Sequence, residues 1–432
     1  MHTLAEYRKP IRPERIIQFG GGGFLRGFFD WMLQKINETG EFCGSAVIVR
    51  SIDAGADGDA FRTQNCNYTH ILRGTEGVET TLVDSVSRCL NATADFDAYL
   101  ALADQPELRF VVSNTTEAGI VFSEEDRFSD APPKHFPAKV TRLLYRRFEN
   151  GLPGFVFLPC ELIERNGDVL RDCILRYAAL WGLGEAFCRY VTEENVFTNT
   201  LVDRINTGYP KENAPALGYE DKLLNTSEFY HLWVIETELD LERELPFSAA
   251  GLNVIVTRDG LARYRTRKVR ILNGAHTSLV PHALLSGFAT VKECVDDADM
   301  RAYLERAVFD EIIPTLDLPR EELVSYAESV LTRFSNPYIR HYLADISLNS
   351  VSKFKVRVLP SILAYYERFG KAPETLTFAF RRLIEFYRVG TTRDDPAVTE
   401  LMKTRSVREI LENRELWGED LSFLAEVIEP CE

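Results

Sequence analysis

The sequence lacks an apolar run long enough to span a membrane, and residues 1–15 lack the apolar core of a secretion signal. None of its eight cysteines forms a C-x-x-C pair or lies near a histidine at zinc-site spacing. Positive charge is scarce, because 65 acidic residues against 50 lysines and arginines leave a formal net charge of −15. Such a charge repels nucleic acid and anionic lipid. We therefore expect a cytoplasmic protein with reduced thiols, whose partner is a small molecule rather than nucleic acid or a membrane.

The first part of the chain alternates between short apolar segments and helical patterns. The predicted strands are residues 15–19, 46–50, 109–113 and 154–158, and the predicted helices are residues 24–31, 96–103 and 137–148. Strand, helix and strand within a short stretch predict a βαβ unit and a parallel sheet. The fold class is therefore α/β, with a doubly wound N-terminal domain of Rossmann type.

The second half of the chain contains few β-branched runs and reads as helices. The predicted helices are residues 268–285, 299–313, 320–334 and 374–387. A chain of 432 residues is also too long for one simple core. We place a Rossmann-type domain at residues 1–262 and a mainly α-helical C-terminal domain at residues 263–432, with a strand-like segment at 252–257 near their junction.

A glycine-rich segment joins the first predicted strand to the first predicted helix. Gly20 and Gly22 match the first two glycines of G-x-G-x-x-G, but Leu25 takes the place of the third. Gly20 can form the tight turn, and Gly22 lets the backbone approach a pyrophosphate at the helix N-terminus. A glycine-rich turn without a ligand is the alternative. The predicted dinucleotide contacts here are Phe19, Gly20, Gly21, Gly22, Gly23, Phe24 and Leu25.

Polar residues after the next predicted strands extend this candidate site. Asp53 follows the second strand, where an acidic side chain can bind the ribose of NAD. Arg50 ends that strand and would suit the 2′-phosphate of NADP, so NAD is favoured without being fixed. Asn114, Thr115 and Glu117 follow the third strand, where a cofactor crevice forms in such sheets. A helix cap and turn is the alternative interpretation of this last segment.

The most informative segment carries Lys268, Asn273 and His276 at the spacing K-x4-N-x2-H. On an α-helix at 100° per residue, Asn273 lies roughly 140° and His276 roughly 80° from Lys268, so one broad face carries all three. A lysine acts as a general acid-base when burial or nearby positive charge lowers its pKa toward 7–8. An asparagine amide can hold a carbonyl oxygen, and no metal is required. An ordinary helix with an exposed lysine is the alternative from these residues alone.

These two motifs together resemble those of the polyol-specific long-chain dehydrogenases, a family that includes mannitol dehydrogenase and the hexuronate reductases. The first motif is the G-x-G-x-F-x-R of residues 20–26, and the second is residues 268–276. Segments similar to the hexuronate reductases in particular are residues 16–20, 113–120, 159–163, 200–205, 271–277, 334–339 and 352–354. The resemblance implies a Rossmann-type domain, a helical C-terminal domain and hydride transfer with NAD and without a metal.

The resemblance also implies a role for each residue of the second motif. It makes Lys268 the acid-base group, Asn273 the stabiliser of the oxyanion, and His276 a substrate contact. The implied reaction is reduction of the keto-uronate tagaturonate by NADH, with fructuronate reduction or polyol oxidation as alternatives. A sugar sensor that binds NAD without catalysis is an alternative of another class. Leu162 stands where mannitol dehydrogenase has a second oxyanion asparagine, so that role is not assigned.

A uronate substrate carries a carboxylate, which an acidic protein must bind with a local cluster of positive charge. Within the segments that resemble the family, the candidate cations are Arg204 and Lys353, and Asp203, the neighbour of Arg204, is a further candidate substrate contact. Structural salt bridges are the alternative for both cations. The sequence does not specify an oligomeric state.

Overall fold

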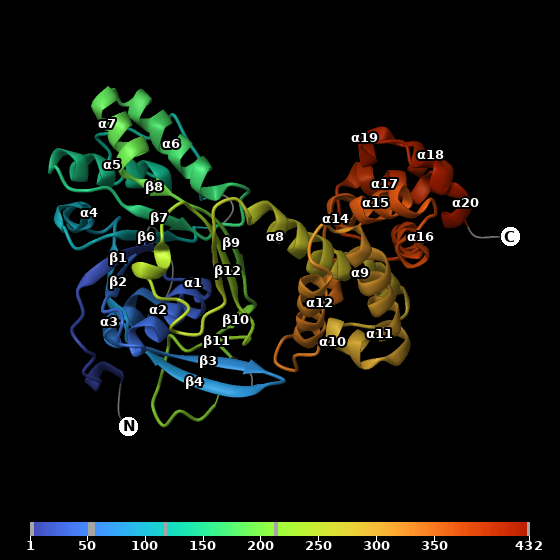
Figure 1. Ribbon diagram of the computed structural model, residues 1–432, viewed down its shortest axis with the longest axis horizontal. Helices are drawn as coiled ribbons and strands as arrows, with labels where there is room; N and C mark the ends of the chain where they lie inside the picture. The colour runs from blue at the N-terminus through green and yellow to red at the C-terminus, as the bar shows by residue number, and fades with distance from the viewer. Residues whose placement is uncertain (1–3, 51–56, 116–118, 211–214, 430–432) are drawn as a thin grey trace. The chain divides into compact units, whose positions relative to one another are not determined.

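The computed structural model describes residues 4–50, 57–115, 119–210 and 215–429 (Figure 1). The chain divides into two compact units, Met1–Leu261 and Ala262–Glu432. The first unit contains the β-sheets with their covering helices, and the second is built from helices. Within the described ranges, no helix is both long and apolar enough to cross a membrane.

A six-stranded parallel sheet forms the centre of the first unit. Its strands, in sheet order, are β5 (Val86–Asn91), β2 (Ser45–Arg50), β1 (Glu14–Phe19), β6 (Phe110–Ser113), β7 (Val156–Pro159) and β8 (Val196–Phe197). The chain moves outward from β1 in one direction and then returns to extend the sheet from β6 in the other. This order is that of a dinucleotide-binding Rossmann sheet. The predicted fold class is therefore confirmed.

Helices cover both faces of this sheet, because successive strand residues point to opposite sides. Ile17, Val111 and Phe157 pack on one face in a core shared with helices α4 (Phe96–Leu100), α5 (Phe136–Glu149) and α6 (Asn166–Leu180). Ile16 and Val112 pack on the other face in a core shared with α2 (Phe29–Glu38). Both faces are therefore apolar, as expected of a doubly wound sheet.

Two smaller sheets complete the first unit, and the sequence did not predict them apart from the strand-like segment at 252–257. One runs β10 (Asn206–Gly208), β11 (Asn225–Ser227), β3 (Tyr68–Gly74) and β4 (Gly77–Val83). The other runs β13 (Val254–Thr257), β12 (Leu232–Glu236) and β9 (Asn199–Asp203). Trp233 of β12 is fully buried and contacts Phe28 and Phe29 edge to face, which joins the three-stranded sheet to α2.

The second unit is organised around one central helix, α9 (Gly274–Leu285), which directly follows a π turn at Lys268–Asn273. Helix α9 contacts α13 (Leu343–Ile346), α14 (Ser350–Arg357) and α16 (Glu374–Val389). The other main helices are α8 (Leu261–Arg267), α10 (Val291–Asp296), α11 (Ala298–Glu305), α12 (Arg320–Phe334), α15 (Leu359–Phe369) and α17 (Pro396–Thr404). Three short helices lie near the C-terminus: α18 (Val407–Glu412), α19 (Arg414–Trp417) and α20 (Ala425–Ile428).

Candidate functional site

The glycine segment of the first unit presents a bare backbone at the N-terminus of helix α1 (Gly23–Gly27). Gly20 has φ of +111°, which favours glycine, and a Cβ there would lie 3.0 Å from the Asn114 carbonyl oxygen. Gly22 caps the helix with φ of −68°, and among the described residues a Cβ there would meet nothing within 4 Å. The open side of the loop is thus at Gly22, where a pyrophosphate could approach the helix N-terminus.

The opposite side of α1 is held by side chains from the four-stranded sheet. Asn225 donates its amide to the Gly23 carbonyl oxygen at 2.8 Å, and Asn206 donates to the same oxygen. A Cβ at Gly27 would lie 2.7 Å from Asn225 Nδ2 and 2.8 Å from the His70 ring. Gly27 therefore permits close packing, whereas Gly22 leaves space for a ligand.

Arg26 holds the glycine loop from within. Its side chain is 7% exposed; Nε donates to the Gly21 carbonyl oxygen at 3.1 Å, and Nη1 donates to the Leu223 carbonyl oxygen. The guanidinium also lies 5.5 Å from the centre of the Tyr68 ring. In the sequence, Arg26 was recognisable only as part of the family-like motif. Its position in the core fixes the loop from the side away from Gly22.

Phe19 and Leu25 belong to the core rather than to a ligand-facing surface. Each side chain is 1% exposed, and Phe19 packs edge to face against Tyr99 and Phe136. Phe24 is half-buried and stacks on Phe28. Any contact that Phe19 or Leu25 makes with a dinucleotide would therefore come from the backbone.

Arg204 is placed differently from the prediction. It is 6% exposed; Nε and Nη2 donate to the Glu228 carbonyl oxygen at 3.0 and 2.8 Å, and Nη1 donates to the Gly27 carbonyl oxygen at 2.9 Å. Its guanidinium lies 4.2 Å from the centre of the Trp31 ring. All three nitrogens are engaged with the fold, so Arg204 anchors the end of α1 and does not present itself to a carboxylate. Asp203 ends β9 and is 4% exposed.

The ends of β6 and β7 meet beside the glycine loop. Asn114 donates its backbone N–H to the Phe19 carbonyl oxygen at 3.1 Å and its amide to the Cys160 carbonyl oxygen at 2.8 Å. Thr115 follows and donates to the carboxylate of Glu161, a residue the sequence analysis did not select. The predicted contacts at Asp53 and Glu117 lie outside the described residues.

The second unit carries Lys268, Asn273 and His276 on one continuous helical segment, but not with the predicted angles. Lys268–Asn273 is a π turn, in which the backbone bond joins residue i to i+5. The α-helical separation of roughly 140° between Lys268 and Asn273 is therefore wrong, because the wider turn brings residue i+5 above residue i. All three side chains are half-buried. Such single π turns inside helices often occur at functional sites.

Aromatic and basic residues surround this segment within the second unit. The His276 ring stacks on Phe334 at 4.2 Å and meets the edge of the His341 ring at 5.6 Å. Burial, followed by the nearby Arg333, lowers the pKa of His341. Arg357 at the end of α14 reaches Thr277, next to His276, with 3.5 Å between Nη1 and Oγ1.

Helix α14 also carries Lys353, one turn before Arg357. Its Nζ donates to the Ile346 carbonyl oxygen at 2.9 Å. Burial lowers the pKa of Lys353, and the positive charges of Arg357 and Arg393 lower it further, while Asp394 acts in the opposite direction. Lys353 therefore lies in a group of cations, and Arg357 is a member that the sequence analysis did not select.

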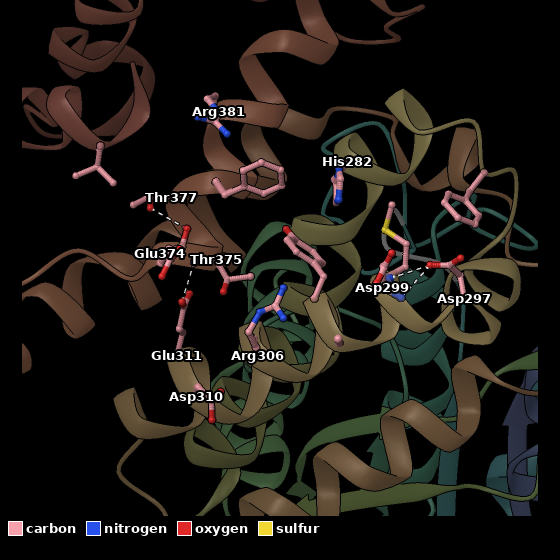
Figure 2. Close-up of a pocket in the computed structure, with 16 residues that line it drawn as sticks. His282, Asp297, Asp299, Arg306, Asp310, Glu311, Glu374, Thr375, Thr377 and Arg381 are labelled. Carbon is pink, nitrogen blue, oxygen red and sulfur yellow. Dashed lines mark hydrogen bonds between the residues drawn. The ribbon is translucent and has the colours of Figure 1, made fainter. Parts of the chain in front are cut away.

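A separate hollow of about 1000 Å³ opens between α9, α11 and α16 of the second unit (Figure 2). Its polar walls include His282, Arg306 and Arg381 together with carboxylates such as Glu311 and Glu374. None of the predicted catalytic or cofactor residues within the described ranges lines it. Glu311 is already engaged, because it accepts the backbone N–H groups that begin α16.

Two family models match the chain and together cover most of it. The mannitol dehydrogenase Rossmann domain matches residues 14–247, and the mannitol dehydrogenase C-terminal domain matches residues 260–431. The second match begins just before the Lys268–His276 segment.

Curated relatives match most of the chain at high identity. An altronate oxidoreductase from Klebsiella pneumoniae (strain 342) is 49% identical over 389 residues, covering 87% of this chain and 80% of the relative. One from Yersinia enterocolitica is 47% identical over 403 residues, covering 90% and 83%. One from Bacillus subtilis (strain 168) is 43% identical over 434 residues, covering 95% and 89%.

Solved structures share the fold at lower identity. A substrate-free D-sorbitol dehydrogenase has a TM-score of 0.82 at 23% identity, with 97% of this chain and 95% of that chain covered. Mannitol 2-dehydrogenase of Pseudomonas fluorescens, solved with NAD and D-mannitol, has a TM-score of 0.71 at 23% identity, with 99% and 91% covered. At this identity the likeness establishes the fold alone.

We predict that two glycine substitutions in α1 separate ligand binding from folding. Gly22→Val should fold normally, because its Cβ meets open space, but should weaken NADH because the side chain takes the place of the pyrophosphate. Gly27→Ala should instead lower the free energy of unfolding by about 1–3 kcal/mol through overpacking. Fluorescence titration with NADH and thermal unfolding measure the two effects. Unchanged NADH affinity in Gly22→Val would contradict a dinucleotide site here.

We also predict that Arg204→Met destabilises the first unit. Removing the guanidinium leaves the carbonyl oxygens of Glu228 and Gly27 buried without these donors, which should cost about 1–3 kcal/mol in urea unfolding. Arg258→Met is the matched control, since Arg258 is 78% exposed and pairs with the exposed Glu238. Equal stability of the two variants would show that Arg204 is not a structural anchor.

Proposed function

The chain belongs to the mannitol dehydrogenase family, and we propose that it interconverts tagaturonate and altronate with NADH and NAD. The observation that carries the proposal is the segment with Lys268, Asn273 and His276, which begins with a π turn, in a chain that also has a bare glycine loop at the start of a Rossmann sheet. The 43–49% identity to altronate oxidoreductases supports this substrate pair over fructuronate and polyols.

In the proposed reaction, NADH supplies a hydride to the keto carbon of tagaturonate. Lys268 donates a proton to the keto oxygen as negative charge develops there, and takes it back in the reverse direction. Asn273 donates its amide N–H to the same oxygen, which stabilises the charge without becoming charged itself. His276, held by its stack on Phe334, donates to a neighbouring hydroxyl and orients the sugar.

The cofactor is held by the first unit in this proposal. The N–H groups at the start of α1 face the pyrophosphate across the open side of Gly22. Asn114 and Thr115 border the same crevice, because their strand β6 lies next to β1. We propose NAD rather than NADP, with Asp53 as the candidate ribose contact and Glu117 as a further cofactor contact.

The uronate carboxylate is proposed to meet the cations of α14. Lys353 and Arg357 lie one helical turn apart, and Arg393 adds a third positive charge near Lys353. A protein with a net charge of −15 needs such a local concentration of positive charge to bind an anion. Lys353 therefore stays the proposed contact for the carboxylate. Arg357 takes the place of Arg204, because Arg204 is engaged in the core. Asp203 stays a proposed substrate contact.

We predict that Lys268→Ala loses several orders of magnitude in turnover while NADH binding persists, because the substitution removes the proton donor and leaves the glycine loop unchanged. Lys292→Ala is the control, since Lys292 is a half-buried lysine of α10 paired with Asp296. Stopped-flow NADH oxidation with tagaturonate measures turnover, and fluorescence titration measures binding. Turnover close to that of the wild type in Lys268→Ala would exclude the mechanism. A wild type that binds NADH without oxidising it would favour a sensor.

We predict that Lys353→Met reduces kcat/KM for tagaturonate by about tenfold to hundredfold, the equivalent of about 1.5–3 kcal/mol for a lost charge-assisted contact. Activity on fructose should change little, because fructose has no carboxylate. Lys355→Met is the control on the same helix, since the Lys355 side chain lies near Gly418. If Lys353→Met lowered kcat/KM equally for tagaturonate and fructose, Lys353 would not be a contact for the carboxylate.

A further inference from the structure

A buried carboxylate lies where two strands of the Rossmann sheet end. Glu161 directly follows β7 and the buried Cys160, and its side chain is 2% exposed. The Cys160 N–H donates to the Ser113 carbonyl oxygen at 2.7 Å, which ties the ends of β6 and β7 together. The Glu161 carboxylate thus lies at the C-terminal edge of the sheet, where dinucleotides bind in this architecture.

Three donors from the neighbouring strand end converge on this carboxylate. The Ser113 hydroxyl donates to Oε2 at 3.0 Å, and the Thr115 N–H and hydroxyl donate to Oε1 at 2.9 Å each. Together the three donors satisfy two carboxylate oxygens, and leaving either oxygen buried without a donor would cost about 1–3 kcal/mol. Burial raises the pKa of Glu161, and the hydrogen bonds from Thr115 and Ser113 act against that shift. The carboxylate therefore holds the side chains of Ser113 and Thr115 and the backbone N–H of Thr115, the two residues on either side of Asn114.

The backbone of Glu161 is fixed independently of its carboxylate. Asn166 donates its amide to the carbonyl oxygens of Glu161 and Pro159, both at 3.0 Å. The Asn166 side-chain oxygen accepts the N–H of Thr200 at 2.8 Å. The position from which the carboxylate acts is thus set by the fold, and a change confined to the carboxylate leaves these bonds in place.

Residues 113–115 in turn contact the glycine loop. The Asn114 N–H donates to the Phe19 carbonyl oxygen at 3.1 Å, and the Asn114 carbonyl oxygen lies 3.0 Å from where a Cβ of Gly20 would be. A shift of this strand end would therefore push the Asn114 carbonyl oxygen against the tight turn at Gly20. Because the order of strands reverses between β1 and β6, this is also the point where the two halves of a dinucleotide meet.

We propose that Glu161 is a positioning residue for the cofactor, whose carboxylate holds residues 113–115 against the glycine loop. It acts through Ser113, Asn114 and Thr115 and needs no contact of its own with the nicotinamide. The inference rests on the proposed NAD-dependent function. Within the described residues, no carboxylate other than that of Glu161 accepts a hydrogen bond from Ser113 or Thr115. The other hydrogen bonds between the strand ends therefore do not hold these two side chains.

The test is Glu161→Gln, with Glu311→Gln as the matched control. Glu311 is also a buried glutamate, 6% exposed, that accepts the N–H groups of Thr375 and Leu376 at 2.7 and 2.8 Å (Figure 2). Both substitutions replace one acceptor oxygen by an NH2 donor in a buried site. Only the first lies beside the glycine loop. A general loss of packing should therefore affect both variants alike.

Fluorescence titration of each full-length variant with NADH, without substrate, gives the deciding readout. We expect Glu161→Gln to raise the Kd for NADH by about tenfold or more, as for a lost hydrogen bond to a charged group, while Glu311→Gln leaves it unchanged. We also expect KM for NADH to rise more than kcat falls. An unchanged Kd in a folded Glu161→Gln variant, or an equal change in both variants, would overturn the proposal.

Ser113→Ala provides a second route if Glu161→Gln fails to fold. It removes one donor to the carboxylate and should weaken NADH by a smaller factor, with KM for tagaturonate unchanged. NADH affinity equal to that of the wild type in Ser113→Ala would count against the proposal. A wild-type protein that fails to bind NADH would instead refute the proposed function, so the two failures are distinguishable.

Discussion

The candidate cofactor site depends on one constraint: the N-terminal backbone of α1 must be held firmly from one side and stay bare on the other. In the part of the chain that the structure describes, no atom lies within 4 Å of where a Cβ of Gly22 would be. On the other side, Asn206 and Asn225 donate to the Gly23 carbonyl oxygen, and Arg26 donates to the carbonyl oxygen of Gly21. These donors satisfy the carbonyl oxygens of Gly21 and Gly23. The four-stranded sheet that supplies both asparagines is therefore part of the site.

The sequence shows which residues are charged, but it does not show which of those charged side chains are buried. Arg204 and Arg357 are equally visible as cations in the sequence, yet Arg204 is enclosed by Trp31 and backbone carbonyls while Arg357 reaches Thr277 beside the candidate catalytic segment. Burial depends on packing between distant segments, which no local pattern encodes. For the same reason the strand pairing of residue 70 with residue 225 was not predicted.

Features that depend on local periodicity were predicted well. Helix α12 begins and ends at the predicted residues 320 and 334, and β1, β2 and β6 lie within one residue of the predicted strands. The K-x4-N-x2-H spacing located the candidate catalytic segment, but an α-helical period of 3.6 could not anticipate the π turn at Lys268–Asn273. Glu161 was not predicted, because a single glutamate after a strand matches no motif. Its role becomes apparent only from the hydrogen-bond donors that surround it in the structure.

In the proposed reaction a hydride passes from NADH to the keto carbon of a uronate. The most direct test is to incubate the protein with tagaturonate and NADH deuterated at C4, each face of the ring in turn. One labelled form should transfer deuterium to carbon in altronate, detected by mass spectrometry and NMR, and the other should leave it on NAD. Altronate without carbon-bound deuterium from either form, or no altronate at all, would contradict this reaction.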